Sequence, residues 1–359
     1  MSTSPKPGAL RGAELLKHRC ASIPHRLPRI EHTCMPDIKW GAWLGKRIVV
    51  VGIGMSEGAA QLACVLWRQL GLNARCLPLS MTLMAPEGSL GDVLVVFSQG
   101  LSSNVGLALE VAHGFDEKLL VTSESCCKAK LEGWRGAGFE CVSFPPDEQE
   151  DGLLLRVVGP TMTNFGLLRM TQHIERALDR CILPDLSTQA LAQHMHQRFE
   201  ATRDDASALA CVAQNHRCVL LTIGQEIEMY HGLRWKLLEG LWIDVPPVLD
   251  ALHFVHGPWQ GVYDHETCFM VFHHGLEVEL NLIERVRSML QPHHTLIEIQ
   301  ADLPSPWDLF EYEAHLNGMI CAHLSSTDLS LERWPGHQTD GALYDISSRA
   351  EVDPSLPSA

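Results

Sequence analysis

Two turns in this sequence place hydroxyl side chains directly after apolar runs that are typical of buried strands. The first, at 52–58, reads GIGMSEG and follows RIVVV. Gly54 and Ser56 stand where a helix would begin, so the Ser56 hydroxyl and the free amides of its first turn could bind an anion. A tight turn that merely needs glycine is the alternative. A dinucleotide fingerprint is not indicated, because the last glycine spacing is one residue too long and no acidic residue ends the next strand near 78.

The second turn, at 98–104, reads SQGLSSN and follows VLVVF. Its polar residues include Ser98, Gln99, Ser102 and Ser103. Ser102 or Ser103 could simply cap the next helix, but three serines and a glutamine exceed what a cap requires. The carboxyl ends of nearby parallel strands meet at one edge of a sheet. We therefore expect the two turns to converge on one anion-binding site.

A third segment contains groups that could move protons. Glu239 ends a stretch with helical spacing whose other positions are largely apolar. A carboxylate at the edge of an apolar site can have a raised pKa and act as a base near neutral pH; a solvated helix terminus is the alternative. His256 precedes Gly-Pro in a loop, where it could be a general acid or a surface residue.

The histidines do not indicate a metal site. His253 and His256, and the adjacent pairs at 273–274 and 293–294, lack the HExxH pattern and have no Cys or carboxylate partner at ligand spacing. With 19 histidines in the chain, adjacency by chance is expected. We therefore expect no metal.

Composition narrows the class of protein. The 359 residues include 28 basic and 43 acidic side chains, a net charge of −15, which argues against a nucleic-acid partner. The apolar runs are too short to cross a bilayer, so no membrane association is expected, and the first residues contain no signal-peptide core. The 12 cysteines include one vicinal pair, Cys126–Cys127, and no CxxC, which favours reduced thiols. We expect a cytoplasmic protein.

Apolar runs alternate with helical spacing in two separate regions. Strands are expected at 46–53, 73–77, 92–97, 118–122, 140–144, 218–223, 267–272 and 295–299, and the main helices at 59–70, 102–113, 126–136, 228–239, 277–290 and 307–323. Continuously apolar strands between helices predict α/β architecture, with two similar doubly wound parallel-sheet domains in tandem. We expect an N-terminal arm (1–40) with a short helix near 10–18, a first domain (41–150), two long connecting helices broken near 184–185 (151–210), a second domain (211–330) and a C-terminal tail (331–359).

These segments together resemble the sugar isomerase (SIS) domain family, in the tandem arrangement of the isomerase half of glucosamine-6-phosphate synthase and of the fructosamine-phosphate deglycases. The family's G-T-S turn resembles residues 54–56, and its S-Q-S-G-E-T phosphate loop resembles residues 98–103. Its E-G-A-L-K-L-K-E helix and later H-G-P resemble residues 232–239 and 256–258. The resemblance covers roughly residues 45–345.

The resemblance implies flavodoxin-like SIS domains, no cofactor and a homodimer with a shared active site. Glu239 would move a proton between C1 and C2 of an open-chain sugar, and His256 would assist ring opening, often from the partner subunit. The implied anion site comprises Gly54, Ser56, Ser98, Gln99, Ser102 and Ser103.

Four positions depart from the family's pattern. Gly100 replaces a loop serine, Leu101 replaces the loop glycine, and Ser102 stands where the family often has Glu. Asp345 stands where the synthase has the lysine that forms a Schiff base. The altered loop leaves open whether the substrate's anionic group is phosphate, sulfonate or carboxylate.

The resemblance implies an enzyme that isomerises a phosphorylated or otherwise anionic sugar or amino sugar between its aldose and ketose forms. The missing lysine argues against the synthase's own amino transfer. Two alternatives stay open. One is a deglycase or deaminase that cleaves an amine from a sugar phosphate, and the other is a sugar-phosphate sensor without catalysis, which the altered loop favours.

Overall fold

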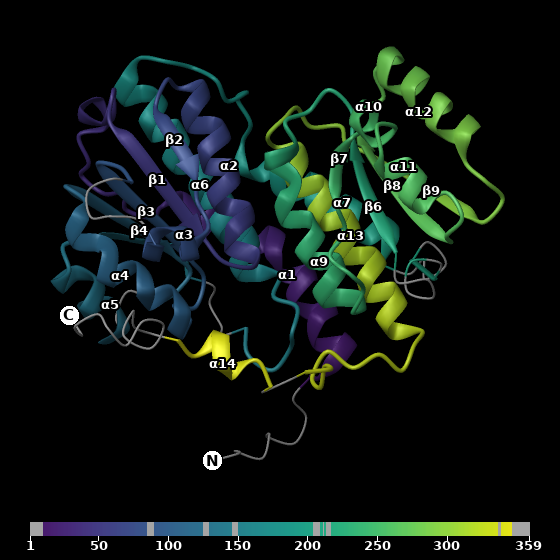
Figure 1. Cartoon of the computed structure of the whole chain (residues 1–359), viewed down its shortest axis with the longest axis horizontal. Coiled ribbons are helices and arrows are strands. Elements are labelled where there is room, and N and C mark those ends of the chain that lie inside the picture. Colours follow the sequence, from purple (N-terminus) through teal and green to yellow (C-terminus); the bar gives the residue numbers. More distant parts are fainter. Residues whose placement is uncertain are drawn as a thin grey trace.

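The computed structural model describes residues 10–84, 90–124, 129–145, 150–203, 209–210, 212, 217–336 and 339–346. Two parallel β-sheets lie side by side, with long helices between them (Figure 1). The tandem, doubly wound α/β architecture expected from the sequence is confirmed. The vicinal cysteines Cys126 and Cys127 lie outside the described residues.

The first sheet has five parallel strands in the order β2-β1-β3-β4-β5. They are β1 (Arg47–Gly52), β2 (Asn73–Cys76), β3 (Val93–Ser98), β4 (Glu117–Thr122) and β5 (Glu140–Ser143). Side chains alternate between the two faces of a strand, so Ile48 and Val50 join a large core cluster, whereas Val49 and Val51 join a smaller one. Both faces are covered, which explains the uninterrupted apolar runs.

Helices cover both faces of this sheet. They are η1 (Trp40–Trp43), α2 (Met55–Gln69), α3 (Leu79–Met84), η2 (Ser103–Gly106), α4 (Leu107–Val111), η3 (Ala112–Gly114) and α5 (Ala129–Gly136). α4 and α5 contribute to the smaller core cluster, and α2 contributes to the large one. The helix expected at 102–113 is divided into α4 and two flanking 3-10 turns.

The second sheet repeats the arrangement with four parallel strands in the order β7-β6-β8-β9. They are β6 (Cys218–Thr222), β7 (Val248–Asp250), β8 (Thr267–His273) and β9 (His294–Gln300). The helices of this region are η4 (Ile227–Tyr230), α9 (His231–Leu241), α10 (Ala251–Phe254), α11 (Pro258–Val262), α12 (Glu277–Met289) and α13 (Asp308–Ser325). In each sheet the chain reverses its direction of winding once, between β1 and β3 and between β6 and β8.

The two long helices expected in the linking region are present as α6 (Val158–Leu178) and α7 (Thr188–Thr202). The N-terminal segment differs from the expected arm with a short helix: α1 (Gly12–Glu31) has 20 residues and packs against α6, α7 and α13. Pro24 and Pro28 lie inside this helix. They obscured it in the sequence, because proline interrupts the hydrogen bonds of most helix interiors.

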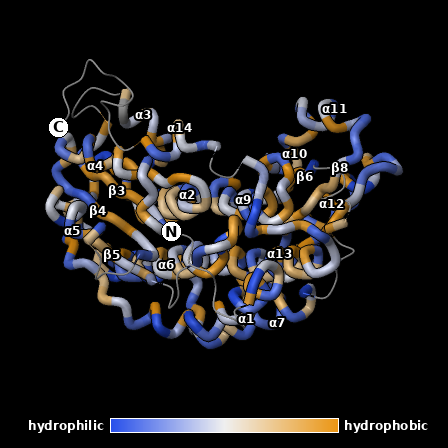
Figure 2. The backbone as a smooth tube through the Cα atoms, turned by 90° about the horizontal axis from the view of Figure 1, so that it is seen from below, coloured by the Kyte–Doolittle hydropathy of each residue, from blue (hydrophilic) through white to orange (hydrophobic). Residues whose placement is uncertain are grey.

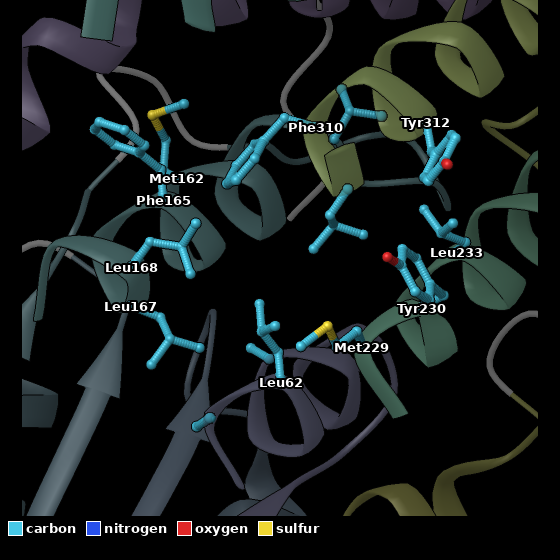
Figure 3. Packing of buried hydrophobic residues seen from close by; sticks show 14 of the residues in the cluster. Leu62, Met162, Phe165, Leu167, Leu168, Met229, Tyr230, Leu233, Phe310 and Tyr312 are labelled. Atoms are coloured by element: carbon cyan, nitrogen blue, oxygen red, sulfur yellow. The ribbon is translucent and has the colours of Figure 1, made fainter. Parts of the chain in front are cut away.

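A single hydrophobic cluster extends from the first sheet through the long helices to the second sheet. Figure 3 shows its centre, where Leu62 of α2 and Leu168 of α6 lie in the same cluster as Met229, Tyr230 and Phe310 from the second half of the chain. The two halves therefore share one core.

Hydrophobic residues concentrate along the strands and the helices between the sheets, and hydrophilic residues along the periphery (Figure 2). Among the helices of the described segments, none is both long enough and apolar enough to span a membrane.

Candidate active site

Two adjoining cavities lie at the carboxyl ends of β1 and β3, where the first sheet changes its direction of winding. The smaller has a volume of about 210 Å³ and is lined by both hydroxyl-bearing turns. The larger has a volume of about 560 Å³ and is lined by Glu239 and by the C-terminal segment. Gln99, Arg156 and Tyr344 line both cavities. This is the position at which doubly wound sheets bind ligands.

The first turn begins with Gly52 and holds Ser56 at the wall of the smaller cavity. A Cβ on Gly52 would collide with the Ser56 carbonyl, so glycine is required there. The Ser56 side chain is buried, and its Oγ accepts a hydrogen bond from the Gln99 N–H at 3.3 Å. This bond links the two turns, and the hydroxyl hydrogen of Ser56 remains available to a ligand.

The second turn is held by a buried serine. Ser98 Oγ accepts the N–H of Leu101 at 3.1 Å. Leu101 has φ +50°, a left-handed conformation that favours glycine, and its side chain is buried in the smaller core cluster. The leucine that replaces the family's glycine thus keeps the glycine's conformation, and burial of its side chain offsets the strain.

The remaining polar residues of the second turn differ in whether they line the smaller cavity. Gln99, Ser102 and Asn104 line the smaller cavity, and Ser102 Oγ donates to Asn104 Oδ1 at 2.9 Å. Ser103 is exposed at the start of η2 and is not among the residues that line this cavity. Gly54, expected beside Ser56, does line it.

Arg156, which the sequence did not single out, lies between the two cavities. The segment that carries it is fixed by Glu150, a buried carboxylate that accepts the N–H groups of Val157 at 2.9 Å and Val158 at 2.8 Å, at the start of α6. Among the described residues, no acidic side chain forms an ion pair with the Arg156 guanidinium. The side chain passes so close to the second turn that a Cβ on Gly100 would stand 2.9 Å from its Nη1.

Glu239 lies near the end of α9 and its carboxylate faces the larger cavity. Burial raises the pKa of this carboxyl from 4.5 to about 7, against the opposing charges of Lys236 and Arg156 and a backbone hydrogen bond from Arg156. Near neutral pH the group is therefore present in both forms. A carboxylate of this kind can both accept and return a proton.

Lys236, one helical turn before Glu239, is fully buried. Its Nζ donates to Asn317 Oδ1 at 3.3 Å and lies 3.9 Å from Glu313 Oε1. Glu313 also accepts a hydrogen bond from Thr161 of α6 at 2.9 Å. This buried polar network joins α9, α13 and α6 behind the larger cavity.

Described residues of the C-terminal segment form part of the wall of the larger cavity. Trp334, Asp340 and the short helix α14 (Gly341–Tyr344) line it together with Asp345. Figure 1 shows α14 below the gap between the two halves of the chain. Asp345 lies in the wall of this cavity. Among the described residues that line it, Arg156 is the one cationic side chain.

His256 lies apart from this site in a single chain. It is exposed in the turn between α10 and α11, where its N–H donates to the His253 carbonyl at 3.0 Å. Gly257 has φ +125° and Pro258 begins α11, so the Gly-Pro pair forms this turn. His256 lines neither cavity.

The corresponding edge of the second sheet has a cavity of about 620 Å³ with different chemistry. Its described lining contains no lysine or arginine. His274 lies there with its Nε2 3.1 Å from Asp308 Oδ2 and its Nδ1 3.5 Å from Glu279 Oε1, and hydrogen bonding to Asp308 raises the pKa of the imidazole. The described lining of this cavity therefore offers an anion neither a guanidinium nor a lysine ammonium group.

A cluster with metal-ligand chemistry lies elsewhere. Atoms of His194, Asp302 and Glu311 lie within 4.8 Å of one another. Arg198 already bonds both carboxylates, at 2.6 Å to Asp302 and 3.2 Å to Glu311. Its guanidinium takes the place that a cation would need.

The first turn also matches the GxSxG pattern of hydrolase nucleophiles at residues 54–58. A nucleophile elbow holds its serine in a strained turn and pairs it with a histidine. Ser56 instead lies within α2, and the described structure gives it a hydrogen bond from Gln99. The turn therefore fits ligand binding better than acyl transfer.

No protein-family model and no curated protein matches this sequence. Solved structures match it along most of its length. The glucosamine-6-phosphate deaminase from Thermotoga maritima is 15% identical with a TM-score of 0.65, over 89% of this chain and 97% of that one. The tagatose-6-phosphate ketose/aldose isomerase from Escherichia coli is 14% identical with a TM-score of 0.63, over 93% and 98%.

The C-terminal domain of glucosamine-fructose-6-phosphate aminotransferase from Francisella tularensis is also similar. It is 13% identical with a TM-score of 0.61, over 91% of this chain and all 100% of that domain. At these identities the likeness concerns the fold. The chain has the tandem SIS fold that its motifs indicated.

Proposed function

We propose that this protein is an enzyme that isomerises an anionic sugar, of the phosphosugar type, between its aldose and ketose forms. One observation carries the proposal: the Glu239 carboxyl, whose pKa is raised by burial to about 7, lines a cavity that shares three lining residues with the smaller cavity beside the two hydroxyl-bearing turns. The names of the structural neighbours, a tagatose-6-phosphate isomerase and a glucosamine-6-phosphate deaminase among them, support a sugar phosphate as substrate.

The two cavities suit the two ends of such a substrate. The anionic group would occupy the smaller cavity, where Ser56, Ser98 and Gln99 offer hydrogen-bond donors. The carbon chain would extend past Gln99 into the larger cavity, towards Glu239. Holding the substrate at its distant anionic group positions C1 and C2 at the base.

The chemical step needs one base. Glu239, as carboxylate, removes the proton from C2 of the aldose while the carbonyl oxygen at C1 gains a proton, which gives an enediol. Glu239 then returns its proton to C1 while the hydroxyl at C2 loses its own proton, which gives the ketose. One proton moves from C2 to C1, and the oxidation states of the two carbons exchange without an external electron acceptor.

We propose that His256 acts in ring opening in a homodimer, from the partner subunit. In a single chain it is exposed and lies outside both cavities. A second copy that brings its α10–α11 turn against the larger cavity would complete the site.

Deuterium incorporation tests the proposal. The protein is incubated in D₂O with tagatose 6-phosphate, fructose 6-phosphate and glucosamine 6-phosphate, and deuterium at C1 or C2 is measured by NMR. We expect exchange with the wild type and none with Glu239→Gln, which should bind the same sugar within a few-fold. Binding without any exchange would contradict the proposal and favour a sensor.

Amine removal is a second candidate, favoured by the acidic wall of the larger cavity. Asp340 and Asp345 line it together with Glu239, and carboxylates attract the ammonium group of an amino sugar. We expect Asp345→Asn to weaken glucosamine 6-phosphate binding by up to about fivefold and to leave fructose 6-phosphate binding unchanged, because Asp345 is exposed. Equal effects on both sugars would count against this candidate. Release of ammonia by the wild type distinguishes the two reactions.

A further inference from the structure

The space beside the second turn is occupied by an arginine where the family's loop has a serine. A Cβ on Gly100 would stand 2.9 Å from Arg156 Nη1, closer than such atoms approach in proteins. Gly100 does not have a left-handed backbone, so its conformation does not require glycine. Glycine at this position leaves room for the Arg156 guanidinium, which a larger residue would displace.

We propose that Gly100 and Arg156 act as a pair, in which the guanidinium replaces the lost serine hydroxyl and binds the terminal oxygens of a tetrahedral oxyanion on the substrate. The inference rests on the proposed function for the identity of that substrate, an anionic sugar. It makes Arg156 the residue that determines specificity for the anionic group.

The position of Arg156 supports this role. Its backbone is held by the neighbouring N–H groups that Glu150 accepts, while its side chain lines both cavities. Among the described residues it forms no ion pair, so the positive charge is available to a ligand. A guanidinium has five N–H donors in a planar fork that matches two oxygens of a phosphate.

The donors around the smaller cavity favour a tetrahedral anion over a planar one. They come from three separate segments: Ser56 in the first turn, Gln99 in the second, and Arg156 before α6. Two oxygens of a carboxylate would leave some of these donors unpaired, whereas the three terminal oxygens of a phosphate or sulfonate can satisfy them.

A double-mutant cycle tests the pairing. Inorganic phosphate, sulfate and acetate are titrated calorimetrically into the wild type, Arg156→Gln, Gly100→Ala and the double variant. We expect phosphate and sulfate to bind more tightly than acetate, and Arg156→Gln to weaken phosphate binding roughly 10- to 100-fold. Gly100→Ala adds only the Cβ and displaces the flexible guanidinium, so it should weaken binding in the same direction.

The double variant should bind phosphate no more weakly than Arg156→Gln alone, because Gly100 matters only through the arginine. Additive losses would overturn the pairing, and unchanged phosphate affinity in Arg156→Gln would overturn the assignment of the guanidinium. Arg287→Gln on α12 is the matched control for lost charge, since Arg287 pairs with exposed Glu284 in the second half of the chain. Circular dichroism of each variant checks that it is folded.

The same variants, tested for anion binding and for deuterium exchange, distinguish a failure of this inference from a failure of the proposed function. If the wild type binds phosphate through Arg156 but incorporates no deuterium into any sugar phosphate, the proposed function fails and the anion site stands. If the wild type isomerises a sugar phosphate and Arg156→Gln does so with an unchanged KM, the anion site fails and the proposed function stands.

Discussion

Gly58 of α2 and Gly232 of α9 lie in direct backbone contact: a Cβ on Gly58 would stand 2.5 Å from the Gly232 Cα. The two helices carry the two parts of the site, because α2 begins beside Ser56 and α9 ends beside Glu239. Glycine at the crossing lets the helices approach each other closely. The contact thereby constrains the separation of Ser56 and Glu239, the proposed anion-binding residue and the proposed base.

Gly58→Ala should destabilise the protein by about 1–3 kcal/mol, because the added methyl group meets backbone that cannot move aside. Helix propensity alone predicts the opposite, since alanine in a helix is about 1 kcal/mol more favourable than glycine. Gly232→Ala is the matched control: its Cβ would stand 3.4 Å from the Gly58 Cα, an ordinary contact. Urea unfolding of both variants measures the difference. Equal stabilities would show that the crossing does not depend on Gly58.

The strands of both sheets could be predicted from the sequence, because each central strand is buried on both faces and is therefore an uninterrupted apolar run. β7 (Val248–Asp250) could not, since three residues are too few to form a pattern. α1 was predicted only in its first part, as a short helix near 10–18, because its two prolines conceal the rest of a helix whose residues Leu16, Ile23 and Leu27 are buried in the shared core.

The site was predictable where it follows a strand and not where it depends on tertiary packing. Ser56 and Ser98 follow β1 and β3 directly, so their place at the sheet edge follows from topology. Arg156 belongs to an irregular segment whose course depends on buried Glu150. No local sequence pattern predicts the hydrogen bonds that Glu150 accepts from the start of α6. Ser103 was also expected in the anion site; it is exposed at the start of η2 and does not line the smaller cavity, whereas Asn104 does.

The pH dependence of turnover should report Glu239. The carboxylate is the base, so kcat/KM should rise with pH and reach half of its limit near the pKa of about 7. Arg156 lowers this pKa, so Arg156→Gln should move the rise to higher pH, whereas Arg287→Gln should not. The profile is measured with the sugar phosphate that shows deuterium exchange. An unchanged pH profile in Arg156→Gln would show that the guanidinium does not affect the pKa of Glu239.

Glu239 should lower the stability of the folded protein at neutral and alkaline pH. Its pKa is raised on folding, from 4.5 to about 7, so the folded state binds the extra proton and loses stability as pH rises through this interval. The loss is at most about 3 kcal/mol for a shift of this size. Glu239→Gln should therefore be more stable than the wild type above pH 7, and this difference should shrink towards pH 5.

Urea unfolding at pH 5, 6, 7 and 8 measures this difference between variant and wild type. Glu228→Gln serves as the control, because Glu228 is exposed on η4 and its removal should change stability by the same small amount at every pH. A constant difference for Glu239→Gln would contradict the buried carboxylate and would indicate that solvent reaches it.

Complementation tests whether His256 acts across a dimer. Glu239→Gln and His256→Gln should each have strongly reduced turnover as homodimers. If each site combines Glu239 of one chain with His256 of its partner, a mixed dimer of the two variants contains one intact site and one site with both changes. Statistical mixing after joint refolding should then restore roughly a quarter of the wild-type turnover, since half of the dimers are mixed and each has one intact site of two.

A site formed within one chain predicts a different result, because every site in the mixed sample would then lack one of the two groups and no turnover would return. Tagging the two variants differently allows the mixed dimers to be purified, and these should reach about half of the wild-type turnover per dimer. The exposed position of His256, outside both cavities of its own chain, favours restoration. Absence of restoration in purified mixed dimers would remove His256 from the shared site and leave ring opening to groups within the larger cavity.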